Sequence, residues 1–421
     1  MRVLSNRWRC GALLAAWAVA LMIIVAGCPQ GGAPPAGNPP AVQPPAGGVD
    51  DGAGDQAGDT PDAGDEDPAS GDDASSDNET QDQGDDAGGS QPDDGDQPDG
   101  DKPDDDSPPN DDPPGETEIR TAFTFDASAL TGAYLMAFHG CDGGNDTCDM
   151  PDNHHVYIAS SDDGVHWTVP DDWQPYQASV PDLVERGDTI YIYSPNEVVL
   201  IDKTTGEVSE PIAVDLEAEE LPAGFVDPSP TLDDEGRIVL FCIAGSLTGG
   251  IGTCTGGETT CTIHVYSATE TDARDGIHFT LDEGTRADVE LDTSTSFKTA
   301  TDPDIFYDGT QYVLYVSQGA SMTVWTSAEL RGNYTLVDTL PDGLLNLGTG
   351  GVGSGVRDET TGMIWTFAHV TEDGVFLIRR AVHADFSTQL AEDDFSVIIQ
   401  GTDLGMSAEQ GNVASPGIWK R

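Results

Sequence analysis

The chain has 421 residues, 76 Asp and Glu residues against 17 Lys and Arg residues, and a formal net charge of −59. Such a charge argues against nucleic acids and acidic polymers as partners, because their own negative charges would be repelled. Neutral sugars, cations and basic surfaces remain compatible with it.

Residues 1–28 start with basic residues, continue with a short apolar run and end in small residues. This order is typical of an export signal peptide, and the run is shorter than the roughly 20 residues of a membrane-spanning helix. The ending Val25-Ala26-Gly27-Cys28 resembles the lipobox of bacterial lipoproteins. The resemblance implies cleavage before Cys28 and lipid attachment to it. It predicts a lipid-anchored protein of the cell envelope that faces the periplasm or the cell exterior.

Residues 29–118 consist almost entirely of Pro, Gly, Ala, Asp, Ser and Gln, with 27 acidic residues against Lys102. Such a segment cannot bury enough apolar surface to offset its ordering entropy, so we expect a disordered linker. The signal peptide carries +3 and the linker −26, which leaves −36 for residues 119–421. That length suffices for one large folded domain.

Five cysteines lie beyond the signal peptide. An exported chain folds in an oxidising compartment, so the two close pairs predict the loop disulfides Cys141–Cys148 and Cys254–Cys261. Cys242 lies in an apolar strand pattern and is predicted to be a buried free thiol. The loop from Asp142 to Asp152 offers oxygen ligands that could hold Ca²⁺, although its spacing is not that of an EF-hand. No other metal or cofactor is predicted.

One strand–turn–strand unit recurs from residue 119 onward. Its copies span Val180–Ser194, Val226–Cys242, Asp302–Gly319 and Gly351–His369, and residues 414–420 repeat its first strand alone. Each copy turns on Gly between two apolar strands. A lone small sheet cannot bury both faces, so the repetition predicts an all-β fold, a five-bladed β-propeller over residues 119–421.

The first sheet lacks such a first strand. Residues 119–125 predict a lead-in strand, and the stretches 133–139 and 155–159 predict the next two. The unpartnered strand at 414–420 is therefore expected to close the ring against this first blade, which removes an open sheet edge. The only candidate helix is a short one from Ala213 to Leu221.

The segment from Ser160 to Thr168 has the spacing Ser-x-Asp-x-Gly-x-x-Trp, and Asp275–Thr280 nearly repeats its second half. This spacing resembles the Asp-box hairpin of sialidases and related propellers. Asp-Gly supplies the tight turn, while Trp167 and Phe279 are expected to pack in the cores of their blades.

Asp182, Asp227, Asp302 and Asp304 stand at the starts of first strands, which line the central channel of a propeller. We therefore expect their carboxyl groups to gather at one mouth of the channel. Clustered carboxylates raise one another's pKa and can divide the roles of acid and base.

The stretches DPSPTLDDEGRIVLF (227–241) and DPDIFYDGTQYVLYVS (302–317) resemble blades of the five-bladed propeller glycosidases, the arabinanase, levansucrase and invertase group. The resemblance covers roughly residues 119–421. It implies one Asp as base or nucleophile, a second Asp that orients and tunes, and a Glu as general acid. Asp227 matches the tuning Asp, and Asp182 or Asp302 stands nearest to the base.

The Glu of that group stands beside a small residue and Pro at a first strand, and this sequence has no such Glu. Asp302 or Asp304 would have to replace it, or Glu409 would have to reach in. Each Asp also has a structural alternative as a turn former that binds backbone amides. His139 and His369 end second strands at matching places and are predicted to contact substrate, although a lone His is more often structural.

The sequence thus leaves two functions open. The first is an exported lipoprotein that recognises or hydrolyses neutral glycans at the channel mouth. The alternative is a non-catalytic surface propeller that binds carbohydrate or protein through the same mouth.

Overall fold

The computed structural model describes residues 119–421 apart from 219–225, 245–252, 255–258, 293 and 295–298. The predicted signal peptide, the lipidation residue Cys28 and the acidic linker lie outside the described residues. The helices described are all short: α1 (Asn145–Cys148), η1 (Ala127–Ala129), η2 (Pro151–Asn153), η3 (Pro341–Gly343), η4 (Glu392–Asp394) and η5 (Gly401–Leu404). None of these is long and apolar enough to cross a membrane.

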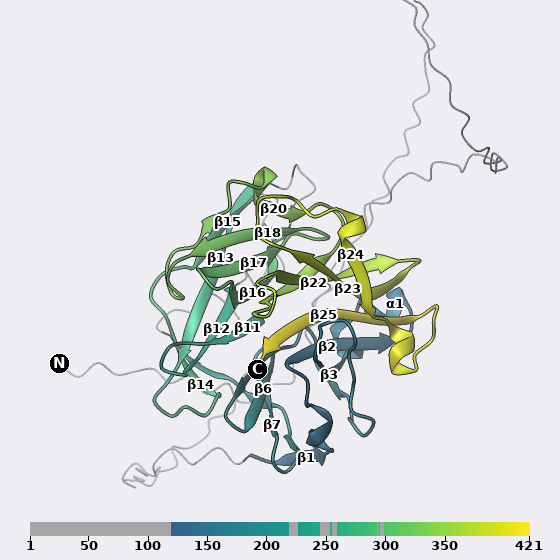
Figure 1. Ribbon diagram of the computed structural model, residues 1–421. Coiled ribbons are helices and arrows are strands. Elements are labelled where there is room, and N and C mark those ends of the chain that lie inside the picture. The colour runs from purple at the N-terminus through teal and green to yellow at the C-terminus, as the bar shows by residue number, and fades with distance from the viewer. Residues whose placement is uncertain (1–118, 219–225, 245–252, 255–258, 293, 295–298) are drawn as a thin grey trace, which may run out of the picture. The chain divides into compact units, whose positions relative to one another are not determined.

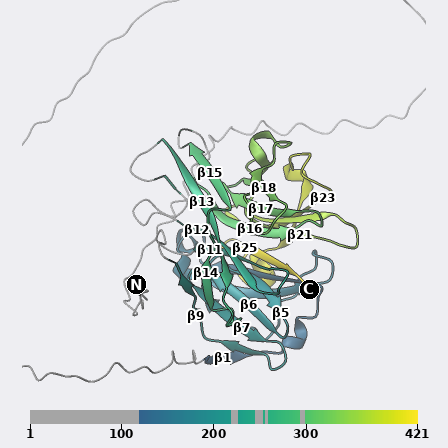
Figure 2. The same cartoon turned by 90° about the vertical axis from the view of Figure 1, so that its left-hand side faces the viewer.

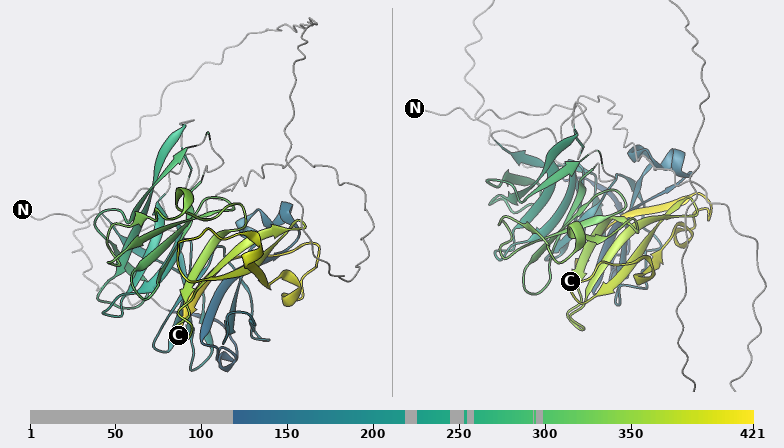
Figure 3. Two further views of the ribbon diagram at one scale, coloured as in Figure 1. Left: turned by 45° about the horizontal axis from the view of Figure 1, so that its top comes forward. Right: turned by 90° about the horizontal axis from the view of Figure 1, so that it is seen from above.

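The strands form five sheets around one axis, which confirms the predicted five-bladed β-propeller (Figure 1). Blade 1 contains β25 (Gly411–Lys420), β2 (Tyr134–Asp142), β3 (His155–Ser161) and β4 (Tyr176–Gln177). Blade 2 contains β5 (Asp182–Arg186), β6 (Thr189–Ser194), β7 (Glu197–Asp202), β8 (Glu207–Ser209), β9 (Ile212–Ala213) and β1 (Thr121–Thr124). Two further views show the same blades from other directions (Figure 3).

Blade 3 has six described strands, as blade 2 has, and Figure 2 labels several of them. It contains β11 (Val226–Leu232), β12 (Ile238–Ala244), β13 (Thr260–Glu270), β14 (His278–Leu281), β10 (Asp215–Glu217) and β15 (Ala287–Asp292). Blade 4 contains β16 (Thr301–Tyr307), β17 (Tyr312–Ser317), β18 (Met322–Ser327), β19 (Thr335–Leu336) and β20 (Leu344–Asn346). Blade 5 contains β21 (Gly351–Arg357), β22 (Ile364–Glu372), β23 (Val375–His383) and β24 (Phe395–Ile399).

The inner strands β5, β11, β16, β21 and β25 contact one another in a closed cycle around the axis. Five hydrophobic clusters lie between neighbouring blades, one at each junction. The cluster between blades 3 and 4, for example, contains Phe241 and Leu314, both fully buried. A blade is thus apolar on both faces, and only a ring of blades buries both.

The C-terminal strand closes the ring, as predicted. β25 pairs antiparallel with β2 from Tyr134↔Lys420 to Asp142↔Gly411. Arg421 continues this contact by donating its backbone N–H to the Ala133 carbonyl at 3.0 Å. The first blade therefore obtains its inner strand from the other end of the domain.

Two details differ from the sequence expectations. The lead-in strand β1 joins blade 2, where it pairs with β8 as the outermost strand. The candidate helix from Ala213 is instead strand over its described part, because β9 pairs with β7 and β10 pairs with β14. Pairing with existing strands satisfies these backbone groups, which a helix this short could not do by itself.

Candidate active site

The inner strands begin around one small cavity at a mouth of the central channel. Its volume is about 30 Å³, which is room for only one or a few water molecules. The lining comes from residues at or near the starts of β5, β11, β16 and β21 and from the middle of β25: Val180, Pro181, Asp182, Asp227, Pro228, Asp302, Pro303, Asp304, Val352, Gly353, Ser415 and Pro416. The structure therefore brings the four predicted aspartates together.

One lining residue in or next to each inner strand has a left-handed backbone. The φ angles are 41° at Val180, 51° at Asp227, 47° at Asp302, 45° at Val352 and 52° at Ser415. A positive φ is costly for a non-glycine residue, above all for β-branched valine. The same strained conformation at all five positions shows that the architecture of the mouth imposes it.

Hydrogen-bond acceptors in the preceding blade bind the backbone N–H groups of four of these residues. His139 Nδ1 accepts the N–H of Val180 at 3.2 Å, and His369 Nδ1 accepts that of Ser415 at 3.3 Å. Ser317 Oγ accepts the N–H of Val352 at 2.7 Å. His139, Ser317 and His369 have equivalent places, since each pairs with the inner strand just beyond a register shift, at Ala414, Thr301 and Gly351.

Asp227 supplies the fourth acceptor, since its Oδ2 accepts the N–H of Asp302 at 3.3 Å. The corresponding second-strand position in blade 3 is Ile243, which has no side-chain acceptor. Asp227 thus has a structural contact in addition to its place in the cavity. An Asn at this position would keep that acceptor and lose the ionisable group.

A second ring of residues lies two positions further along the chain from the five left-handed residues. Its members pair in register with the second strands: Asp182↔Tyr193, Ser229↔Phe241, Asp304↔Tyr315, Ser354↔Phe367 and Gly417↔Ala137. Hydroxyl groups of this ring bind its carboxyl groups, Ser229 with Asp182 and Ser354 with Asp304.

The first carboxyl pair consists of Asp227 and Asp302. Burial raises the pKa of Asp227 to about 6, against the lowering effect of the Asp302 N–H. Burial, and then the charge of Asp227, raise the pKa of Asp302 well above its ordinary value. Both side chains remain partly exposed toward the cavity. Near neutral pH such a pair holds one proton between two groups.

The second pair consists of Asp182 and Asp304. Burial raises the pKa of Asp304 to about 7, although Ser354 and the Gly355 N–H stabilise its charged form. Burial, and then the charge of Asp304, raise the pKa of Asp182 well above its ordinary value. Gly417 leaves room for the Asp182 side chain, since a Cβ at residue 417 would stand 2.2 Å from Asp182 Oδ1. This pair can therefore also provide a proton donor beside a proton acceptor.

No glutamate stands among the described residues that line this cavity. Glu409 is exposed in the loop before β25, where its backbone N–H is bound by Ser407 Oγ at 3.3 Å. The only fully buried glutamate side chain among the described ion pairs is Glu270 of blade 3, which binds Arg186 of blade 2. Catalytic roles for the four aspartates stay predictions.

The two predicted substrate histidines stand behind the mouth and are not among the residues that line its cavity. Burial, and then His154 and His369, lower the pKa of His139 well below its ordinary value, while burial and His154 lower the pKa of His369 to about 4. Both rings are therefore neutral near pH 7 and serve as acceptors for backbone N–H groups. A direct contact with substrate stays a prediction.

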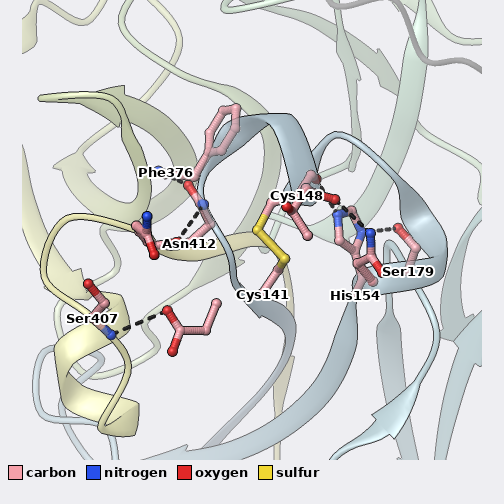
Figure 4. The surroundings of a disulfide bond; sticks show 11 residues. Cys141, Cys148, His154, Ser179, Phe376, Ser407 and Asn412 are labelled. Atoms are coloured by element: carbon pink, nitrogen blue, oxygen red, sulfur yellow. Dashed lines mark hydrogen bonds between the residues drawn. A yellow bond between two sulfur atoms is a disulfide. The ribbon is translucent and has the colours of Figure 1, made fainter.

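His154 links the histidines to the first disulfide (Figure 4). Its ring stacks on His139 with centroids 3.9 Å apart. Its Nε2 donates to the Cys148 carbonyl at 2.7 Å, and its Nδ1 lies 2.8 Å from Ser179 Oγ, next to strained Val180. The Cys141–Cys148 bond thus fixes a loop that supports one side of the mouth.

Cys254 and Cys261 form the other disulfide, and Cys242 is a buried free thiol. In the predicted calcium loop, Asp142 Oδ1 accepts the Ser407 N–H at 3.4 Å. Within the described residues, no three His, Cys, Asp or Glu side chains are grouped to hold a metal ion. Calcium binding at Asp142–Asp152 stays a prediction.

Three pairs of antiparallel strands extend past the mouth from blades 1, 3 and 5. β2 and β25 continue beyond His139 to Asp142↔Gly411. β13 continues past β12 and pairs with β15 out to Thr260↔Asp292. β22 and β23 continue beyond His369 to Glu372↔Val375. The mouth therefore lies below three walls that could contact a long ligand.

No family model matches this sequence, and no curated protein matches it in sequence. Solved structures match at the level of the fold. A xylan β-1,4-xylosidase from Bacillus halodurans C-125 has 16% identity and a TM-score of 0.37, over 62% of this chain and 55% of that one. This chain thus spans about half the length of that enzyme.

Two other matches are GH43 proteins. A β-xylosidase/α-arabinofuranosidase from a compost metagenome has 14% identity and a TM-score of 0.42, over 63% of this chain and 95% of that one. A GH43_1 enzyme from Xanthomonas citri has 18% identity and a TM-score of 0.41, over 67% and 92%. At these identities the similarity concerns the fold, and the named activities belong to those proteins.

Proposed function

We propose that this protein binds neutral glycans across the channel mouth and hydrolyses them with its paired carboxyl groups. The observation that carries the proposal is the meeting of two aspartate pairs at one cavity, with every pKa raised by burial. Acid and base catalysis needs groups whose pKa values lie near the working pH. Asp227 and Asp304, with pKa values of about 6 and 7, meet that need.

The cavity volume defines how a glycan would bind. About 30 Å³ is far below the roughly 300–1,000 Å³ of a pocket that encloses a small ligand. The sugar would therefore lie over the mouth, between the three strand pairs that extend past it, while the cavity holds water beside the carboxyl groups. Half-buried Phe376, on the wall of blade 5, offers an apolar surface for a sugar ring.

Hydrolysis of arabinan, xylan, fructan and aryl glycosides tests this proposal. Asp227→Asn should lower kcat by roughly 10²–10⁴-fold, the usual contribution of acid–base catalysis. It should still fold, since Asn keeps the acceptor for the Asp302 N–H. Asp163→Asn, on an outer hairpin, is the matched control and should leave kcat unchanged. Turnover that persists in Asp227→Asn would remove this residue from the mechanism.

The second candidate is a non-catalytic propeller that binds carbohydrate or protein at the mouth. The absence of a glutamate from the described lining and the structural contact of Asp227 favour it. Glycan binding by the wild type without turnover of any substrate would support this candidate. Neither binding nor turnover on the whole panel would argue against both functions.

We also propose that the protein is exported and anchored by lipid on Cys28. The basic, apolar and small-residue order of residues 1–28 supports this, as does the Val-Ala-Gly-Cys ending. The acidic linker would then hold the propeller away from the membrane. Intact protein should enter the detergent phase in a partition assay, and Cys28→Ala should move it to the aqueous phase.

A further inference from the structure

A groove lies between blades 4 and 5, at the far ends of the strands whose first residues form the mouth. Its volume is about 740 Å³, within the range typical of small-ligand sites. It is lined by the turn after β16, the end of β21 and the segment after β23. β16 and β21 have seven residues each, so the groove lies roughly 20 Å from the mouth.

Arg357 in this groove forms no ion pair with the described residues. Its Nε is buried and makes no hydrogen bond. The positive charge of Arg357 helps to lower the pKa of Glu359, but the Glu359 carboxylate binds Lys420 at 2.8 Å. A buried donor left without an acceptor is costly and rare in folded proteins. In a chain of net charge −59, an arginine that forms no ion pair with a described carboxylate points to an external acceptor.

The turn after β16 is shaped to hold this guanidinium. Gly309 has φ 96°, and a Cβ there would stand 1.4 Å from Arg357 Nη1. Only glycine leaves room for the side chain in this place. Asp308 forms no ion pair with the arginine, and its Oδ1 accepts the N–H groups of Thr310 and Gln311 within its own turn.

The remaining lining suits a polyhydroxylated molecule. Thr326, Thr335 and Ser387 bring hydroxyl groups to the groove, and buried Ile364 and Phe386 form an apolar part of its surface. Asp338 and Asp385 add carboxylates that can accept hydrogen bonds from sugar hydroxyls but would repel a polyanion. The lining therefore selects for one carboxylate on an otherwise neutral ligand.

We propose that this groove binds a single uronic acid unit of an otherwise neutral glycan, with the sugar carboxylate on the Arg357 guanidinium. Arginine suits this role because its planar fork can bind both carboxylate oxygens. The site is separate from the channel mouth and does not depend on hydrolysis there.

Calorimetric titration of the full chain with D-glucuronic acid, D-glucose and acetate tests the proposal. We expect binding of glucuronic acid and at least tenfold weaker binding of the other two. Arg357→Gln should weaken glucuronic acid binding by roughly 10–100-fold, as expected for loss of a hydrogen bond to a charged group. Thr326→Val should weaken it less, through the lost hydroxyl.

Arg274→Gln is the matched control, since Arg274 is an exposed arginine of blade 3 outside the groove. It should bind glucuronic acid as the wild type does. Equal affinity for acetate and glucuronic acid, or unchanged affinity in Arg357→Gln, would overturn the proposal. Melting temperatures show that the variants fold. Because binding is read directly, absence of hydrolysis at the mouth does not affect the result.

Discussion

The aspartates of the channel mouth and those of the outer hairpins are the same residue in opposite situations. Asp275 Oδ1 accepts the N–H groups of Ile277 and His278 at 2.9 and 3.1 Å, and its Oδ2 lies 2.6 Å from His278 Nδ1. These donors lower its pKa despite partial burial. At the mouth, Asp302 has burial and a second carboxylate beside it, and its pKa is raised.

The difference teaches how to separate a structural carboxylate from a reactive one in a propeller. Asp163 repeats the hairpin arrangement of Asp275 almost contact for contact, and its pKa is likewise lowered. A carboxylate that accepts hydrogen bonds from several backbone N–H groups is held in its charged form, and its oxygens are already hydrogen-bonded. One that is buried with few donors keeps its proton close to neutral pH and is available for proton transfer.

The largest expected effect is on the pH dependence of stability. A raised folded pKa means that the folded state holds protons more tightly, so the stability from the mouth is full below the ordinary value of 3.8. It is lost as pH rises through about 6 for Asp227 and about 7 for Asp304. Asp227→Asn and Asp304→Asn should each flatten the decline in unfolding free energy from pH 4 to 8, measured by urea titration.

The hairpin aspartates should behave in the reverse sense. Their lowered pKa values add stability above 3.8 that is lost as pH falls. Asp275→Asn should therefore reduce stability at pH 7 more than at pH 3. A mouth variant and a hairpin variant with the same pH profile would refute the contrast between the two regions.

The next effect concerns the hairpin turn itself. Asp275→Ala removes the acceptor for two backbone N–H groups and should cost about 1–2 kcal/mol of unfolding free energy, as for a lost cap. Asp272→Ala, three residues earlier and exposed, is the control and should change stability by less than about 0.5 kcal/mol. Equal losses would mean that the turn contacts of Asp275 contribute nothing specific.

The smallest effect concerns backbone strain at the mouth. Val352 has φ 45° and is only half-buried, so Val352→Gly should relieve strain of about 1–2 kcal/mol and lose little packing. We expect unfolding free energy to stay level or to rise slightly. Val313→Gly, in the fully buried centre of β17, should instead be strongly destabilising. A large loss in Val352→Gly would show that the left-handed backbone there costs little.

Much of the fold could be predicted because its signals are local. The first strands with Pro, the Gly turns and the apolar second strands each depend on a few neighbouring residues. The unpartnered strand at 414–420 predicted ring closure, and β25 provides it. The place of β1 in blade 2, where it pairs with β8, could not be predicted, because residues 121–124 do not belong to the repeated unit.

The site was accessible from sequence only in part. Repetition of the first strands placed Asp182, Asp227, Asp302 and Asp304 near one another, since equivalent positions meet at the axis. The role of Ser317 as an acceptor was missed, and its signal was the shared register with His139 and His369. The unsatisfied Nε of Arg357 has no local signal in the sequence, because Glu359 pairs with Lys420, which is distant along the chain.

The pairing of β2 with β25 joins residues from almost opposite ends of the described chain. Contacts between such distant positions form late, because the entropy of closing so long a loop must first be overcome. Four blades can gain their hairpins as neighbours in sequence, whereas blade 1 has no inner strand until this last contact forms. Closure of the whole domain therefore depends on one junction. If the pairing of β2 with β25 were blocked, the edges of both strands would be open to other molecules.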